Sequence, residues 1–133
     1  MPHVHEAQDQ ADIKPRQNSN LPPQDLHTLR PLIESLGRHG ERPAVIALQG
    51  QGAEEWSYTR LAEHVRRVAF GLAGRGIGAG RHVALLAGNR PEWVAACLAV
   101  VSAGAVPVLI DVQLREDLLR HVLRDSAPRL IFE

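Results

Sequence analysis

The 133-residue sequence is poor in cysteine and lysine and carries no net charge. Its only cysteine is Cys97, so no disulfide framework can form within the chain, as is typical of proteins from reducing compartments. Its only lysine is Lys14, which excludes a lysine-dependent phosphate loop or Schiff-base site from the rest of the chain. The 15 basic residues balance the 15 acidic ones, so charge gives no reason to expect nucleic acid or an anionic membrane as a partner.

No catalytic or metal-binding motif is complete in the sequence. It contains no Gly-x-x-x-x-Gly-Lys-Ser/Thr, His-Glu-x-x-His or Cys-x-x-Cys pattern, and its serines lack the glycine frame of a nucleophile elbow. His64 and His121 fall on expected helices without a visible acid or nucleophile partner, and His3 and His5 stand in a polar N-terminal stretch. We therefore expect no metal site and no complete active site.

The longest uncharged run covers the 18 residues Trp93–Ile110, and its length invites comparison with a membrane span. Ser102, Gly104 and Pro107 interrupt it, so a buried helix followed by a buried strand explains it better. Residues 1–23 are polar and lack the apolar core of a signal peptide. The sequence predicts a soluble, cytoplasmic protein without a membrane span.

The region from residue 76 to 109 predicts a strand, a helix and a second strand. His82–Ala87 is a short apolar run without alternation, as expected for a strand covered on both faces. Asn89 is a candidate cap for a helix that begins at Pro91, where the missing N–H costs nothing. That helix ends near Gly104, and Ala105–Ile110 is again an apolar run. We therefore predict an α/β fold with a mostly parallel, Rossmann-like sheet and helices on its faces.

The remaining elements follow from the same patterning. Residues 1–23 lack periodicity and are expected to be disordered or loosely attached, whereas residues 24–133 are expected to form one α/β subdomain. The first expected elements are a helix from Gln24 that Pro31 starts or kinks, a buried strand at Ala44–Leu48 and a return strand at Glu54–Tyr58. Next come a helix capped by Thr59, a helix opened by Glu116 and a strand at Arg129–Glu133. The apolar side of the helix after Thr59 carries Leu61, Val65, Val68, Ala69 and Leu72, and that of the helix after Glu116 carries Leu118, Leu119, Val122 and Leu123.

The alternating glycines at positions 74, 76, 78 and 80 do not make a dinucleotide loop. Such a loop follows a strand and opens a helix, whereas these glycines follow an expected helix and precede an expected strand. Their position is that of a helix C-cap and a tight turn. This order argues against a small Rossmann-type nucleotide-binding domain.

Six short segments, in a fixed order, give the region from Leu26 to Glu133 a family resemblance. They read Glu41-Arg42-Pro43-Ala44-Val45, Trp56-Ser57-Tyr58-Thr59-Arg60-Leu61, Gly74 to Ala84, Asn89-Arg90-Pro91-Glu92-Trp93, Ala103-Gly104-Ala105-Val106 and Leu123 to Ile131. In this order and spacing the region resembles the beginning of the adenylate-forming (AMP-binding) superfamily, most of all the acyl-CoA synthetases, or fatty-acid–CoA ligases. The resemblance covers the first quarter or so of a family member, and the sequence ends on an apolar strand, so we expect a truncated piece of the large N-terminal domain.

The resemblance implies a two-step ligase. A carboxylate such as a fatty acid attacks the α-phosphate of ATP to give an acyl-adenylate and pyrophosphate, and a thiol, usually that of coenzyme A, then takes the acyl group. The parent enzyme would use ATP, Mg²⁺ and coenzyme A, whereas no cofactor is expected for this piece, because the family's phosphate loop and lysines lie beyond it. We expect the 133-residue chain to be inactive alone and to need the remainder of the parent enzyme as its partner.

The resemblance also suggests one candidate binding loop, Asp111, Val112 and Gln113. In acyl-CoA synthetases the corresponding loop lies close to the path of the pantetheine arm. Many relatives carry a Pro-Leu-Asp/Asn-Pro series there, and this chain has Leu109 and Val112 in place of the two prolines. An ordinary strand-to-helix loop with Asp111 as a turn residue remains an alternative.

Two functional hypotheses from different classes stay open. The first is an inactive piece of an ATP-dependent carboxylate–CoA ligase, and the second is a stand-alone, non-catalytic interaction module with the same fold. In either case a parallel sheet that lacks cover exposes apolar surface and unpaired strand edges, so we expect the isolated chain to self-associate. The sequence specifies neither the acyl chain nor the thiol acceptor.

Overall fold

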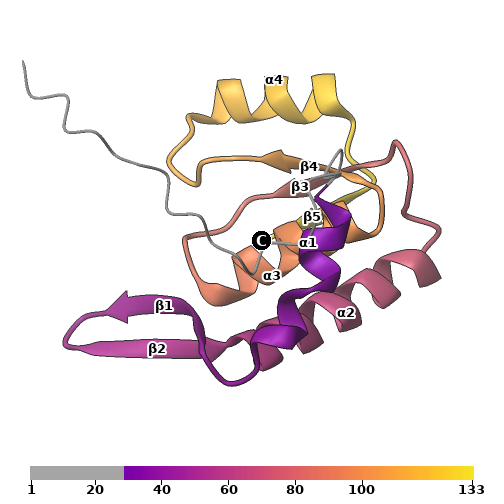
Figure 1. Ribbon diagram of the computed structural model, residues 1–133. Coiled ribbons are helices and arrows are strands. Elements are labelled where there is room, and N and C mark those ends of the chain that lie inside the picture. Colours follow the sequence, from indigo (N-terminus) through magenta and orange to yellow (C-terminus); the bar gives the residue numbers. More distant parts are fainter. Residues whose placement is uncertain (1–28) are drawn as a thin grey trace, which may run out of the picture.

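The computed structural model describes residues 29–133 and contains two separate sheets (Figure 1). One is an antiparallel hairpin and the other is a three-stranded parallel sheet. The expected boundary between residues 1–23 and 24–133, and the expected helix before Leu29, lie outside the described residues. Within the described residues no helix is long and apolar enough to cross a bilayer.

The parallel sheet consists of β3 (His82–Leu85), β4 (Val106–Leu109) and β5 (Leu130–Phe132) in the order β4-β3-β5. Helix α3 (Pro91–Ser102) connects β3 to β4, and α4 (Glu116–Ser126) connects β4 to β5. Figure 1 shows α3 on one face of this sheet and α4 on the other. The predicted α/β class, with a parallel sheet and flanking helices, is confirmed, although each strand is shorter than expected.

The core lies between α3, the sheet and the long helix α2 (Tyr58–Gly74). It forms two clusters of buried side chains, and each fully buried aliphatic side chain contributes about 1.5–3 kcal/mol. The buried members are Ile33, Trp56, Leu61, Val65, Ala95 and Ala99 in the first cluster, and Leu72, Ile77, Val83, Val100 and Ala105 in the second.

The hairpin pairs β1 (Pro43–Gln49) with β2 (Gly52–Ser57). The prediction of a buried strand at Ala44–Leu48 is wrong in one respect, because Ile46 is 58% and Leu48 is 84% exposed. Only one face of the hairpin packs on the helices, through Val45 and Trp56, so alternate side chains of this apolar run face water.

The described part of the expected N-terminal helix consists of two pieces. The described part comprises α1 (Arg30–Glu34), with Pro31 in its first turn, and a 3₁₀ turn at Leu36–His39. Pro31 therefore starts a helix rather than kinking one, within the residues that the structure describes.

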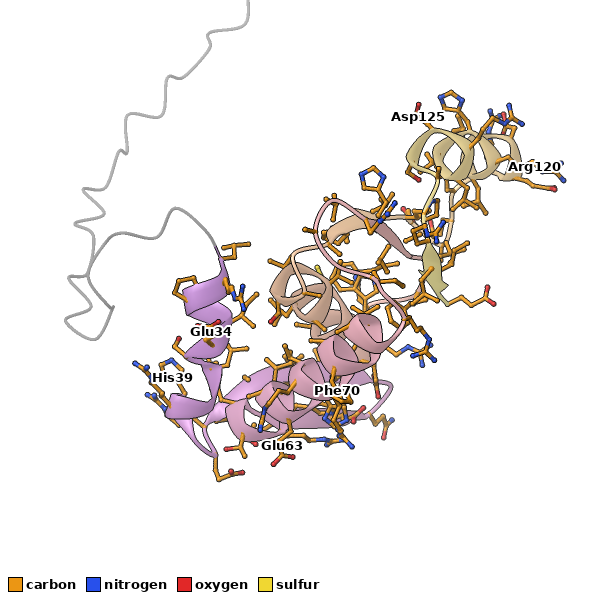
Figure 2. The ribbon with its side chains drawn as sticks, turned by 90° about the vertical axis from the view of Figure 1, so that its right-hand side faces the viewer. Glu34, His39, Glu63, Phe70, Arg120 and Asp125 are labelled. Carbon is orange, nitrogen blue, oxygen red and sulfur yellow. The ribbon has the colours of Figure 1, made fainter. Side chains whose placement is uncertain are left out.

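Helix α4 is strongly amphipathic but buries none of its residues completely. Leu118, expected on the inner side, is 45% exposed. In Figure 2, Arg120 and Asp125 mark α4 at the end of the molecule opposite to Glu63 and Phe70 on α2. The sheet face under α4 is thus only partly covered.

Helix α2 is capped by Ser57, not by the predicted Thr59. The Ser57 hydroxyl accepts a hydrogen bond from Arg60 N (3.2 Å), and Ser57 has the extended backbone of an N-cap residue. Because Tyr58 is already helical, Thr59 lies inside the first turn. Ser57 directly precedes the helix in the sequence, so the cap is local and lies two residues before the predicted one.

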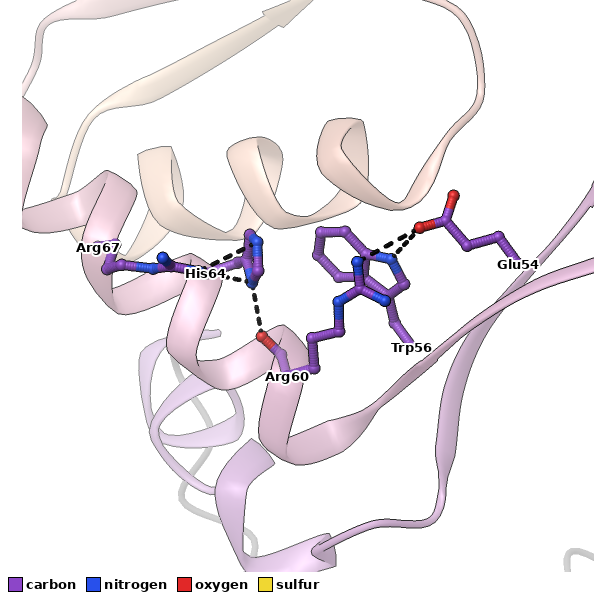
Figure 3. Close-up of polar contacts among 5 residues, drawn as sticks. All are labelled: Glu54, Trp56, Arg60, His64 and Arg67. Atoms are coloured by element: carbon purple, nitrogen blue, oxygen red, sulfur yellow. Dashed lines mark hydrogen bonds and ion pairs between the residues drawn. The ribbon is translucent and has the colours of Figure 1, made fainter.

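His64 on α2 is part of a polar cluster around Trp56 (Figure 3). Its ring lies 4.3 Å from the indole ring, its Nδ1 is 3.0 Å from Arg60 O, and Arg67 Nη2 is 3.1 Å from its Nε2. The Trp56 Nε1–H donates to Glu54 Oε1 (2.7 Å), and the Arg60 guanidinium lies over the indole. The cluster ties the hairpin to α2 and has a structural role.

Candidate functional site

The carboxyl ends of β3 and β4 diverge into a crevice. The chain leaves β3 toward α3 on one face of the sheet and leaves β4 toward α4 on the other (Figure 1). In open parallel sheets, ligands bind where adjacent strands send their connections to opposite faces. Here the crevice has a volume of about 550 Å³ and is lined by Ala87, Gly88, Asn89, Trp93, Leu109, Ile110, Asp111, Val112 and Gln113.

The structure brings all three predicted site residues, Asp111, Val112 and Gln113, into the wall of this crevice. Asp111 Oδ1 accepts a hydrogen bond from Gln113 N (2.8 Å), and Asp111 O accepts one from Leu114 N (3.0 Å). Asp111 is therefore a turn residue, as the alternative interpretation expected. The turn presents Val112, which is 56% exposed, at the crevice.

The β4 side of the crevice is held to β3 by the backbone. Ile110 N donates to Leu85 O (3.0 Å), which continues the parallel ladder one residue beyond β4. The loop that follows therefore begins at a fixed place relative to β3. This attachment makes the wall around Asp111 part of the sheet framework.

The β3 side of the crevice contains two residues that the sequence interpretation did not assign to a site, Asn89 and Trp93. Asn89 was expected to cap α3, but the N-cap is Arg90, which makes no side-chain capping bond. Pro91 is at the first helical position and buried, as predicted. Since Trp93 follows Asn89 by one helical turn, both lie on the crevice side of the α3 entry. The predicted βαβ unit could have pointed to Asn89 and Trp93. Its two parallel strands end side by side, so the residues that follow both strands lie near each other.

The chemistry of the crevice is that of binding rather than bond breaking. Asp111 is its only ionisable lining residue, and one of its carboxylate oxygens is engaged by Gln113. The described residues contain no cluster of three His, Cys, Asp or Glu side chains able to hold a metal ion. With Asp111 as its single ionisable lining residue, the crevice offers no acid–base pair.

The glycines before β3 form a helix cap and turn, as predicted. Ile77 N donates to Leu72 O and Gly76 N donates to Ala73 O (3.0 and 2.9 Å), which closes the end of α2. Gly76 has φ +68°, the left-handed conformation typical of this motif. These residues precede a strand and lie away from the crevice.

The other reactive side chains also lie outside the crevice. Burial raises the pKa of the Cys97 thiol on α3 by desolvation, so the thiolate is disfavoured. Ser126 Oγ donates to Val122 O (2.7 Å), and His82 Nδ1 lies 2.6 Å from Ser126 O. Of these groups only His82 joins two elements, β3 and the end of α4, and none of them lines the crevice.

Comparison with known proteins identifies the family. Residues 32–133 match the family described as AMP-binding enzyme. The 3-hydroxybenzoate–CoA ligase of Aromatoleum sp. (strain CIB) is 34% identical over 102 residues, which are 77% of this chain and 18% of the ligase. Surfactin synthase subunit 3 of Bacillus subtilis (strain 168) is 34% identical over 110 residues, which are 80% of this chain and 8% of the subunit.

A solved structure agrees in fold. The N-terminal subdomain of Klebsiella oxytoca NpsA superposes with a TM-score of 0.69 at 24% identity, covering 79% of this chain and 27% of that one. The chain spans less than a fifth of the length of either curated relative. The match over residues 32–133 confirms the resemblance: the chain belongs to the AMP-binding enzyme family of adenylate-forming ligases.

Proposed function

We propose that the chain is the N-terminal part of an ATP-dependent carboxylate–CoA ligase and that its crevice lies on the acceptor-thiol side of the active site. The observation that carries this proposal is the position of Asp111, Val112 and Gln113 in one crevice wall at the carboxyl ends of β3 and β4. The pantetheine arm would lie along this wall. An elongated, mostly uncharged arm suits a crevice that combines apolar side chains with amide groups and one engaged carboxylate.

The adenylation half-reaction is assigned to the remainder of the parent enzyme. In that step the substrate carboxylate attacks the α-phosphate of ATP and pyrophosphate leaves, which requires positive charge at the phosphates. The chain has one lysine, Lys14, and the crevice has no basic lining residue. We propose that the isolated chain is inactive and that residues 24–133 serve as a subdomain of the larger ligase.

The acid substrate is proposed as a carboxylic acid whose chain is selected outside these residues. The motif at Asn89–Trp93 favours an acyl-CoA synthetase over a peptide-synthetase adenylation domain, and the name of the Aromatoleum relative favours a hydroxybenzoate as the acid. A cytoplasmic location accords with the supply of ATP and coenzyme A. A stand-alone interaction module is the second candidate, because the crevice contains binding surface and no catalytic pair.

The test is calorimetric titration of the chain with pantetheine, with coenzyme A and with ATP–Mg²⁺. The sequence alone predicted no cofactor for this piece, but because all the lining residues of the crevice belong to it, we expect saturable binding of pantetheine and coenzyme A and no binding of ATP–Mg²⁺. In a Gln113→Trp variant the indole fills the crevice, so binding should fall at least tenfold. Gln51→Trp places the same change on the exposed hairpin turn and should bind as the unchanged chain does.

Each part of the proposal has its own contrary result. Absence of pantetheine and coenzyme A binding, or equal binding by the Gln113→Trp variant, overturns the acceptor-side assignment. Saturable ATP–Mg²⁺ binding overturns the assignment of adenylation to the rest of the enzyme. Thioester formation by the chain alone, with ATP, a carboxylic acid and coenzyme A supplied, would contradict its inactivity.

A further inference from the structure

The side chain of Asn89 lines the crevice from the β3 side, and the start of α3 does not account for it. The N-cap of this helix is Arg90, and no side chain makes a capping bond there. Asn89 is exposed, whereas Pro91, two residues later, is buried. The Asn89 amide therefore stands at the crevice with donor and acceptor groups that the helix start does not use.

Trp93 gives the same wall a rigid apolar surface. Its backbone belongs to the first turn of α3, where Trp93 N donates to Arg90 O (3.0 Å). Buried residues on both sides of it, Pro91 and Ala95, hold this end of the helix against the core. The Trp93 side chain itself is only partly buried and lines the crevice. An indole at such a place offers a large contact area that loses little conformational entropy when a ligand binds.

The opposite wall carries a second side-chain amide, that of Gln113. The bond that shapes the Asp111 turn uses the backbone N–H of Gln113 (2.8 Å to Asp111 Oδ1), so the side-chain amide is not part of that turn. Gln113 is exposed and lines the crevice. Each wall of the crevice thus contributes one amide, and aromatic or aliphatic side chains surround both.

This pairing of amides with apolar surface corresponds to the chemistry of a pantetheine arm. Along the arm, amide groups alternate with methylene groups, and a carbon with two methyl groups lies toward one end. Side-chain amides both donate and accept, so they suit the amides of an uncharged ligand. Small-molecule sites commonly combine apolar and aromatic lining with a few polar groups that fix the orientation of the ligand.

We propose that Asn89 and Trp93 are binding residues for the pantetheine arm. The indole of Trp93 packs against the methylene and methyl groups of the arm, and the Asn89 amide hydrogen-bonds one of its amides, across the crevice from Gln113. The arm is then held between the segment that follows β3 and the segment that follows β4. This inference rests on the proposed function, which places the arm along the Asp111 wall, and it adds the wall opposite.

The test is titration of the 133-residue chain with pantetheine, followed by calorimetry and by tryptophan fluorescence. Because Trp93 lines the crevice and Trp56 is 1% exposed, binding should shift the emission of Trp93. Asn89→Ala should weaken binding about three- to tenfold, the effect of one lost hydrogen bond. Trp93→Ala should weaken it roughly tenfold. Trp93→Phe keeps an aromatic ring, so it should retain most of the affinity while the emission shift disappears.

The control is Gln51→Ala on the exposed hairpin turn, which should bind as the unchanged chain does. Circular dichroism establishes that each variant is folded. Asn89 is exposed and does not cap α3, so its replacement tests the inference even where loss of the indole unfolds the chain.

The outcomes separate this inference from the proposed function. If pantetheine binds the unchanged chain and Gln113→Trp weakens the binding, but Asn89→Ala binds as well as the unchanged chain, the inference is wrong and the proposed function stands. An emission shift that persists in Trp93→Phe also overturns the place given to Trp93. If the unchanged chain does not bind pantetheine, both are wrong.

Discussion

Ala127 provides a sharp test of the structure, because it is the only residue other than glycine with a positive φ among the described residues. It ends α4 with φ 41° and ψ 58°, and its N–H donates to Leu123 O (3.0 Å). This left-handed conformation is the usual end of a helix, but glycine normally occupies it. We therefore predict that Ala127→Gly stabilises the protein.

The expected size follows from two opposing effects. The left-handed conformation costs a residue with a Cβ atom about 1–2 kcal/mol, which glycine avoids. Glycine also gains freedom in the unfolded chain, which costs about 0.4–1 kcal/mol of stability. The net gain is about 0.5–1 kcal/mol, or a rise of roughly 0.3–0.7 M in the urea midpoint for a chain of this size.

The assay is urea denaturation followed by tryptophan fluorescence, since Trp56 is buried in the folded state. Ala73→Gly is the matched control, because Ala73 lies exposed in the last turn of α2 with helical geometry. There the same substitution should destabilise by about 0.5–1 kcal/mol. An Ala127→Gly variant that is no more stable than the unchanged chain, while Ala73→Gly behaves as expected, would refute the assigned end of α4.

Three further predictions concern the α2 cap, the buried thiol and the crevice loop. Ser57→Ala should destabilise by about 1 kcal/mol in urea denaturation, and Thr59→Ala by less than about 0.5 kcal/mol, because only Ser57 caps the helix; equal effects would contradict this. Because burial raises the pKa of Cys97, its neutral form stabilises the fold below the ordinary thiol pKa, and this stability is lost as pH rises through the higher folded-state value. Cys97→Ala should remove that part of the pH dependence, measured by thermal unfolding, and an unchanged profile would argue against it. Val112→Pro should stabilise by about 0.4–1 kcal/mol in thermal unfolding, since the N–H that holds the Asp111 turn is that of Gln113 and Val112 supplies none; a loss of stability would show that the loop cannot accept proline.

The topology was predictable because its signals are local. Apolar runs, Pro91 at a helix start and Gly104 at a helix end define the βαβ unit within a short segment, and the structure has that unit in the predicted order. The error in the cap is one of position, since Ser57 and Thr59 both stand at the start of α2 and only Ser57 accepts the bond from Arg60 N. The error in burial depends on other parts of the chain, because no described residue covers the hairpin face that carries Ile46 and Leu48.

One wall of the candidate crevice was predicted from the sequence, and the opposite wall was not. The family resemblance placed Asp111, Val112 and Gln113 near a binding path, and the structure places them in a crevice wall. Asn89 and Trp93 form the opposite wall only because β3 and β4 pair in parallel and end together. Their contribution depends on strand pairing, which a local pattern for a single turn does not contain.

The departure from the family's proline pattern leaves the backbone of the crevice intact. Leu109 and Val112 replace the two prolines, and a proline matters chiefly where an N–H is needed. The N–H of Leu109 points away from β3, since Ile110 N makes the bond to Leu85 O, and Val112 N makes no backbone bond among the described residues. Neither position therefore supplies a hydrogen bond that proline would remove, and the Asp111 side chain holds the loop through Gln113 N. The two replacements consequently change the stiffness of the loop and the side chains along the crevice, while the hydrogen bonds that shape its wall are compatible with either version.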